Sequence, residues 1–256
     1  MKMKRGVVMF SRTENLQTFT RSYPVVSLFI LIQVALFVIE QLNAFFNFGF
    51  SPLNYGAAIN LFIGNGEWWR VVTATFLHYD FWHIAFNTFA LIIFAPALER
   101  MIGHAKFASF YLLVGTLANV LTYFTKINEP FYGQAGASGA ILGLLGFYVY
   151  LGRFKRTVIS ADDARLVYIF SAITAIFTLL GSNVSVFGHL YGFVLGFLAG
   201  FIFGKGTVPF TRPFNTGRRP ASGGHIIHTS GSGQLGRIVF YVIVAFAVFG
   251  LLARFI

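Results

Sequence analysis

Ser138 and His189 are the two residues of this 256-residue sequence whose types and positions most strongly suggest chemistry. Ser138 lies in a Gly-Ala-Ser-Gly sequence at the start of one apolar stretch, and His189 lies at the start of another. A serine hydroxyl becomes a good nucleophile when an adjacent base removes its proton, and histidine is the usual base. Polar groups at membrane depth are costly and are usually retained for function. The pair is therefore predicted to form two halves of a catalytic site within a bilayer.

The composition of the chain predicts a membrane protein. Hydrophobic residues make up 56% of the sequence and charged residues only 11%, and the mean hydropathy is +0.71. Soluble domains carry about 25% charged residues, so this chain could not cover itself with a polar surface. Cysteine is absent, which excludes disulfides, thiolate metal sites and cysteine nucleophiles. No cofactor is expected.

Apolar runs near the ~20 residues needed to cross a bilayer divide the chain. They predict an all-α polytopic membrane protein with a six-helix bundle and an additional C-terminal transmembrane helix. The predicted spans are 25–43, 81–98, 107–125, 135–152, 166–182, 186–204 and 238–253. The expected domains are a cytoplasmic N-terminal segment 1–24, a six-span core 25–204, a flexible basic cytoplasmic linker 205–237 and a seventh span within 238–256.

Topology, rather than nucleic-acid binding, explains the net charge of +11. If the N-terminus is cytoplasmic, all basic residues except Arg70, Lys126 and Arg254 fall on the cytoplasmic side. This is the distribution that the positive-inside rule describes. We therefore expect a multi-pass protein of the cell membrane, surrounded by the lipid bilayer and without a nucleic-acid partner.

The same topology places the candidate groups at one level of the membrane. The second, fourth and sixth spans all begin on the external side, and they carry His83 and Asn87, Ser138, and His189 respectively. His83 and Asn87 are spaced i, i+4 and share one helix face. We expect an active site toward the external side, where these two side chains and the Ser138 backbone N–H stabilise an oxyanion. No acidic residue follows Asp163, so a Ser–His dyad is predicted rather than a triad.

Glycine stripes would let two of the helices approach closely. The sixth span carries one glycine at every fourth position, and the fourth span carries glycines on one face. The stripes are Gly192, Gly196, Gly200 and Gly204, and Gly139, Gly143 and Gly146. Taken alone, they are explained by tight packing without chemistry. Because Ser138 and His189 stand at their heads, we expect this packing to bring the hydroxyl to the imidazole.

These motifs, taken together, resemble those of the rhomboid intramembrane serine proteases over residues 25–204. The sequence around Ser138 matches the family's G-x-S-G, whose serine is the nucleophile, and the eight residues from His189 match the pattern that begins with the base. His78, His83 and Asn87 match H-x4-H-x3-N. The resemblance implies oxyanion roles for His83 and Asn87 and a structural role for His78.

Other positions are expected to be structural. Near the site these are Gly136, Gly139 and Gly192, and the resemblance adds Trp69-Arg70 and Glu99-Arg100. One position departs from the pattern: Leu142 stands where some bacterial members carry a tyrosine stacked on the catalytic histidine. Another side chain must therefore pack on His189. The seventh span places the chain with the six-plus-one members.

The resemblance implies an endopeptidase that cuts membrane proteins in or near the outer part of a transmembrane segment. A helix hides its scissile carbonyl, so the substrate must unwind locally to reach Ser138.

The alternative is a non-catalytic rhomboid-like protein that binds transmembrane helices, but the chain retains both Ser138 and His189. A zinc protease would need His-Glu-x-x-His on a span, and none occurs, so no metal site is expected.

Overall fold

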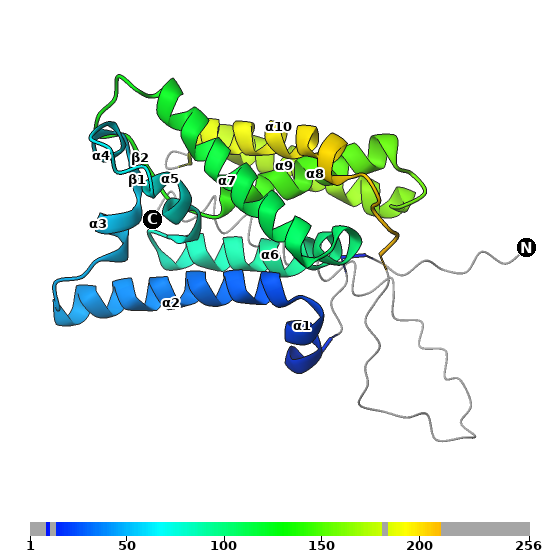
Figure 1. Cartoon of the computed structure of the whole chain (residues 1–256), viewed down its shortest axis with the longest axis horizontal. Coiled ribbons are helices and arrows are strands. Elements are labelled where there is room, and N and C mark those ends of the chain that lie inside the picture. Colours follow the sequence, from blue (N-terminus) through cyan, green and yellow to red (C-terminus); the bar gives the residue numbers. More distant parts are fainter. Residues whose placement is uncertain (1–8, 11–13, 181–183, 211–256) are drawn as a thin grey trace, which may run out of the picture. The chain divides into compact units, whose positions relative to one another are not determined.

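The computed structural model describes residues 9–10, 14–180 and 184–210. The chain is an all-α polytopic membrane protein, and five helices among the described residues are long and apolar enough to cross a membrane (Figure 1). They are α2 (Pro24–Phe46), α6 (Phe81–Ile102), α7 (His104–Thr125), α9 (Ala161–Leu180) and α10 (Val186–Phe203). A sixth apolar helix, α8 (Ser138–Phe154), has 17 residues. The predicted seventh span and the predicted linker from residue 211 onward lie outside the described residues.

All six predicted spans of the core are helices among the described residues, with bounds that differ from the prediction by up to five residues; the starts of α9 and α8 have clear local causes. Helix α9 begins at Ala161 because Ser160 caps it: the Ser160 hydroxyl accepts the Asp163 N–H (3.1 Å) and donates to the Asp163 carboxylate (2.7 Å). Helix α8 begins at Ser138 rather than at 135, because Gly136 has φ +131°, outside the helical region.

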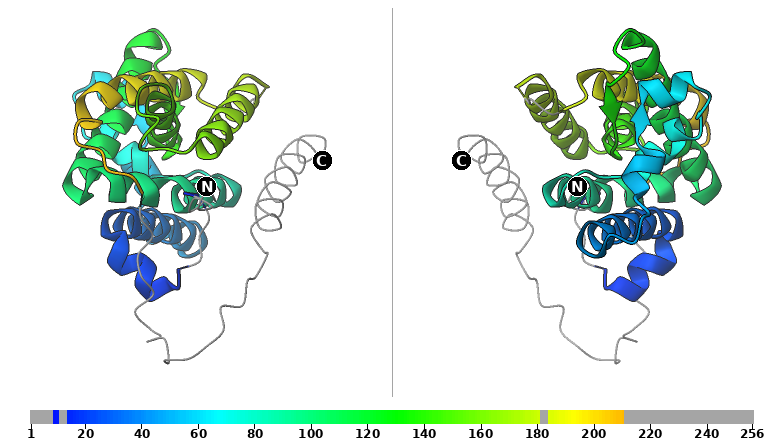
Figure 2. Two further views of the ribbon diagram at one scale, coloured as in Figure 1. Left: turned by 90° about the vertical axis from the view of Figure 1, so that its right-hand side faces the viewer. Right: turned by 90° about the vertical axis from the view of Figure 1, so that its left-hand side faces the viewer.

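Helix α8 is the most enclosed helix of the bundle. It packs most closely on α10 and also contacts α6, α7 and α9. Twelve of its 17 residues are buried. Helix α9 lies at an edge of the bundle, chiefly against α8 (Figure 2). Ser138 is therefore the first residue of the helix that the others surround.

The first span, α2, is attached to the bundle through its N-terminal half, where Val26, Phe29 and Gln33 are buried. The side chain of its N-cap residue, Tyr23, makes no capping hydrogen bond to the helix. Instead the buried carboxylate of Glu99, on α6, accepts the N–H groups of Val25 (3.0 Å) and Val26 (2.9 Å). A carboxylate at this end of a helix satisfies free donors and opposes the helix dipole. A short helix, α1 (Leu16–Ser22), precedes α2 and is capped by Asn15.

Residues 44–80, which lie between the first two predicted spans, contain several short elements after the end of α2. They are α3 (Pro52–Gly56), β1 (Ala58–Ile59), α4 (Asn60–Gly64), α5 (Arg70–Thr73) and a 3-10 helix, η1 (Ala74–Phe76). Strand β1 pairs antiparallel with β2 (Gly133–Gln134), which lies shortly before α8. The loop therefore connects directly to the segment that leads into Ser138.

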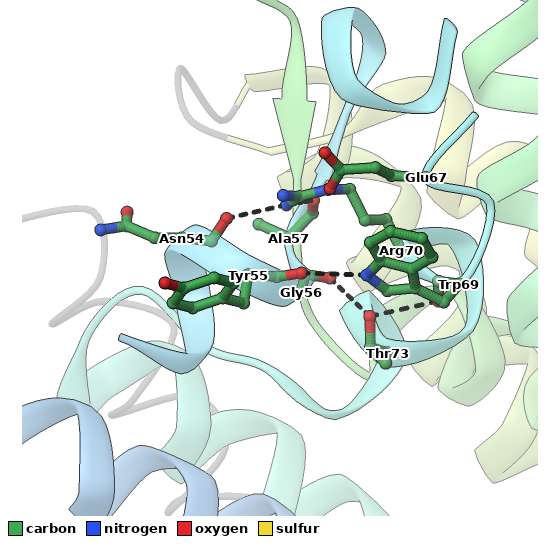
Figure 3. Close-up of polar contacts among 8 residues, drawn as sticks. All are labelled: Asn54, Tyr55, Gly56, Ala57, Glu67, Trp69, Arg70 and Thr73. Atoms are coloured by element: carbon green, nitrogen blue, oxygen red, sulfur yellow. Dashed lines mark hydrogen bonds and ion pairs between the residues drawn. The ribbon is translucent and has the colours of Figure 1, made fainter. Parts of the chain in front are cut away.

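Arg70 holds this segment together (Figure 3). Its side chain is buried, and its guanidinium donates to the carbonyls of Asn54 (2.9 Å) and Ala57 (3.0 Å) and to the carboxylate of Glu67 (2.7 Å). The Trp69 indole N–H donates to the carbonyl of Tyr55 (3.2 Å). These bonds link α3 to α5, which fits the structural role expected for Trp69-Arg70.

Candidate functional site

Ser138 follows a backbone segment that is anchored on two sides. Strand β2 pairs with β1, and the N–H of Gly136 donates to the carbonyl of Ala74 (2.8 Å). A Cβ at Gly136 would lie 2.6 Å from Nε2 of His83 and 3.6 Å from Oγ of Ser138. The His83 ring and the Ser138 hydroxyl therefore lie on the same side of Gly136. This close approach and the positive φ both favour glycine at this position.

The backbone of Ser138 also offers a donor. As the first residue of α8, it carries an N–H without an acceptor inside the helix. The positive end of the helix dipole lies at the same point and favours a negative charge there. The beginning of α8 is therefore suited to an oxyanion that develops on the oxygen of a carbonyl group whose carbon Oγ attacks.

Ser185 fixes the beginning of α10, the helix of His189. Its hydroxyl accepts the N–H of Gly188 (3.1 Å) and donates to Oε1 of Gln134 (2.8 Å), and the hydroxyl of Tyr132 lies 3.1 Å away. Gln134 belongs to β2, four residues before Ser138. One set of hydrogen bonds thus positions the starts of both α8 and α10.

The glycine stripes predicted for these two helices do meet. A Cβ at Gly192 would overlap the carbonyl oxygen of Gly139, and a Cβ at Gly196 would overlap that of Gly143. A Cβ at Gly146 would overlap the carbonyl oxygen of Phe193. The helices are in backbone contact along this line, so the close approach expected from the stripes is confirmed.

Ser138 and His189 stand at the heads of this contact. A Cβ at Gly139, the next residue after Ser138, would lie 3.4 Å from the carbonyl oxygen of Gly188, which directly precedes His189. In the part of the chain that the structure describes, no hydrogen bond joins the Ser138 hydroxyl to the His189 ring. Nδ1 of His189 lies 2.7 Å from the hydroxyl of Thr178, on α9.

The two candidate oxyanion residues of α6 differ in their surroundings. Asp80 caps the helix through the N–H of His83 (2.9 Å), which fixes the first turn. The His83 ring reaches Gly136, beside Ser138. The buried side chain of Asn87 donates one N–H to the carbonyl of His83 (3.0 Å), and its amide has a second N–H.

His78 is buried beside His83, with their ring centroids 4.9 Å apart and the rings edge to face. Burial, together with the charge of His83, lowers the pKa of His78 to about 3, so the His78 ring is neutral near neutral pH. This contact supports the His83 ring, which fits the structural role expected for His78. Among the described residues, no group of three or more His, Cys, Asp or Glu side chains could hold a metal ion.

Thr178, Gln134 and Ser185 were not predicted from the sequence. For Thr178 a signal existed: Thr174 and Thr178 are spaced i, i+4 within a predicted span, so they form a polar stripe at membrane depth. Gln134 and Ser185 lie just outside predicted spans, where polar residues are ordinary. Nothing in their positions indicated that they would meet.

Known proteins with similar sequences support the resemblance. The rhomboid domain family matches residues 65–206, more than half of the chain. The protein named "Putative rhomboid protease YdcA" of Bacillus subtilis (strain 168) is 39% identical over 185 residues that cover 72% of this chain and 90% of YdcA. Rhomboid protease GluP of the same organism is 33% identical over 165 residues, 64% of this chain and 32% of GluP. Rhomboid-like protease 1 of Toxoplasma gondii is 28% identical over 144 residues, 55% of this chain and 48% of that protein.

The chain therefore belongs to the rhomboid family. It is a multi-pass membrane protein, and the relatives named as proteases support a peptidase activity within the membrane.

Proposed function

We propose that this chain is an intramembrane serine endopeptidase, with Ser138 as the nucleophile and His189 as the general base. The observation that carries the proposal is the glycine contact between α8 and α10. At one end of this contact Gly139 meets Gly188, and these two glycines directly adjoin Ser138 and His189. Membership of a family with relatives named as proteases supports the reaction class.

In the proposed reaction, Nε2 of His189 removes the proton of Ser138 as Oγ attacks the scissile carbonyl carbon. The resulting oxyanion accepts hydrogen bonds from the Ser138 N–H, from the His83 ring and from the second N–H of Asn87. The His189 imidazolium then donates its proton to the leaving amide nitrogen, and the peptide C–N bond breaks. Water, activated by His189, hydrolyses the acyl ester in the same way. A hydroxyl–imidazole hydrogen bond that is absent without substrate can form in the complex.

The proposed substrates are transmembrane segments of other membrane proteins. The bilayer core holds no water to satisfy backbone groups, so a spanning segment is helical and its carbonyls are already hydrogen-bonded. It must therefore leave its helical form locally to present a carbonyl to Ser138. The distribution of basic residues supports a cytoplasmic N-terminus and a site toward the external side of the cell membrane.

A non-catalytic protein that binds transmembrane helices is the second candidate. It is favoured by one observation, namely that no hydrogen bond joins Ser138 to His189 in the described residues. The two candidates differ in whether Ser138 reacts.

The deciding experiment treats the purified protein in detergent with a serine-directed fluorophosphonate and measures cleavage of a reporter transmembrane substrate. Wild type and Ser171→Ala, which alters another serine within a span, are expected to be labelled and active. Ser138→Ala should be unlabelled, and His189→Gln should lose cleavage while remaining folded. The double variant should be no worse than either single variant, because the pair acts as a unit. Cleavage by purified Ser138→Ala would overturn the assignment, and a folded, unlabelled and inactive wild type would favour the binding protein.

A further inference from the structure

Thr178 contacts the candidate base from a helix that has few other contacts with α10. Its side chain is buried, and its Oγ1 lies 2.7 Å from Nδ1 of His189. Helix α9 packs mainly on α8 and touches α10 sparsely. We propose that Thr178 is a positioning residue that holds the His189 ring in the tautomer with its lone pair on Nε2. This proposal rests on the proposed Ser–His dyad.

The direction of the hydrogen bond follows from the second partner of Thr178. Its Oγ1 lies 2.8 Å from the carbonyl oxygen of Thr174, and a carbonyl can only accept. The single hydroxyl proton is therefore used on Thr174, and the lone pairs of Oγ1 remain for His189. Because Oγ1 must accept, Nδ1 of His189 must carry a proton. In a neutral imidazole this leaves Nε2 unprotonated, as a base for serine requires.

The geometry around Thr178 is restrained on both sides. The bond to Thr174 is the back-bond from a threonine hydroxyl to the carbonyl four residues earlier, and it limits rotation of the side chain. Oγ1 is thereby held at one position opposite His189. In serine triads a carboxylate holds the histidine in the correct tautomer. This chain has no acidic residue after Asp163, and Thr178 occupies the corresponding place as a neutral acceptor.

Thr174 provides a matched control on the same helix. Its hydroxyl donates to the carbonyl of Phe170 (2.8 Å) in the same type of back-bond. It lies one turn away from Thr178. Thr174→Val and Thr178→Val therefore remove the same group from the same helix, whereas only the second removes the acceptor of His189. Thr178→Ser keeps the hydroxyl and tests rescue.

The first measurement is the rate of labelling of Ser138 by a fluorophosphonate, together with kcat and KM for a reporter transmembrane substrate. Thr178→Val should lower the labelling rate and kcat about tenfold with little change in KM, as expected for the loss of one hydrogen bond that orients the base. Thr178→Ser and Thr174→Val should stay near wild type. Equal labelling rates for Thr178→Val and wild type would overturn the role of Thr178. If wild type shows no Ser138-dependent labelling, the proposed Ser138–His189 dyad is wrong, whatever the role of Thr178.

The second measurement does not depend on activity. Histidine labelled with 15N is read by NMR, and the His189 signals are assigned by their loss in His189→Gln. We expect a protonated Nδ1 and an unprotonated Nε2 in wild type and Thr178→Ser, and a changed tautomer population in Thr178→Val. A wild-type ring with an unprotonated Nδ1 would overturn the proposal, even if Thr178→Val failed to fold.

Discussion

Gly192 of α10 lies directly against the backbone carbonyl of Gly139 in α8, with no room for a methyl group at Gly192. Lipid is as apolar as the helix surfaces, so the hydrophobic effect gives little preference for one helix arrangement over another. Shape must therefore determine how these two helices pair. The contact at Gly192 sets their register at the level of Ser138 and His189.

Gly192→Ala should destabilise the protein strongly, whereas Gly139→Ala should not. A methyl group at Gly192 would overlap backbone atoms, which cannot rotate away, but one at Gly139 would make an ordinary contact at 3.4 Å. Overpacking of this kind costs about 1–3 kcal/mol, which corresponds to roughly 2–12 °C in melting temperature for a chain of this size. Thermal unfolding in detergent checks the difference. Equal melting temperatures for the two variants would contradict the described contact.

Substitutions at the two candidate oxyanion donors should lower kcat to different degrees. His83→Phe keeps the aromatic contact with His78 but removes the donor near Ser138, so kcat should fall about 10²–10³-fold. Asn87→Ala should cost less, because one of its N–H groups is already used on the carbonyl of His83. Thr88→Val, on the same helix, is the control. Wild-type kcat in both test variants would reduce these residues to a packing role.

The stability of the protein should fall with acid partly because of His78. Its ordinary pKa of 6.5 falls to about 3 on folding, so below about pH 6.5 the unfolded chain binds a proton that the folded chain does not. The stabilisation from the neutral buried ring is complete above the unfolded pKa and is lost as pH falls, by about 1.4 kcal/mol per pH unit until the folded pKa is reached.

Melting temperatures of wild type and His78→Gln, measured at about pH 7.5 and about pH 5.5, test this effect of His78. The variant should lose less stability between the two pH values, although it should be less stable than wild type at the higher one. The same loss in both proteins would show that His78 does not bind protons differently in the two states.

The orientation of the protein can be tested by cysteine labelling, since the chain has no native cysteine. Asn128, between α7 and α8, and Thr157, between α8 and α9, are both exposed. Asn128→Cys should react with an impermeant maleimide applied to intact cells, and Thr157→Cys should react only after permeabilisation. The opposite pattern would place Ser138 toward the cytoplasm.

The sequence allowed the helices and the contact between α8 and α10 to be predicted, because apolar length and four-residue glycine spacing are local signals. It did not predict the bond between Gln134 and Ser185, which are 51 residues apart. That meeting depends on the pairing of β1 with β2 and on the turn at Gly136. The partner of His189 also came from outside the recognised motifs: Thr178 reaches it from a different helix.

The cap that Glu99 provides for α2 has a consequence for how the protein is made. Val26 and Glu99 are separated by 73 residues, which at about 5–20 residues per second amounts to roughly 4–15 s of synthesis. The first span is complete once Phe46 has been added, so for most of that interval it exists while the carboxylate that completes its amino end has not yet been made. A nascent chain interrupted before Glu99 would therefore carry a first span with unfilled backbone donors at that end.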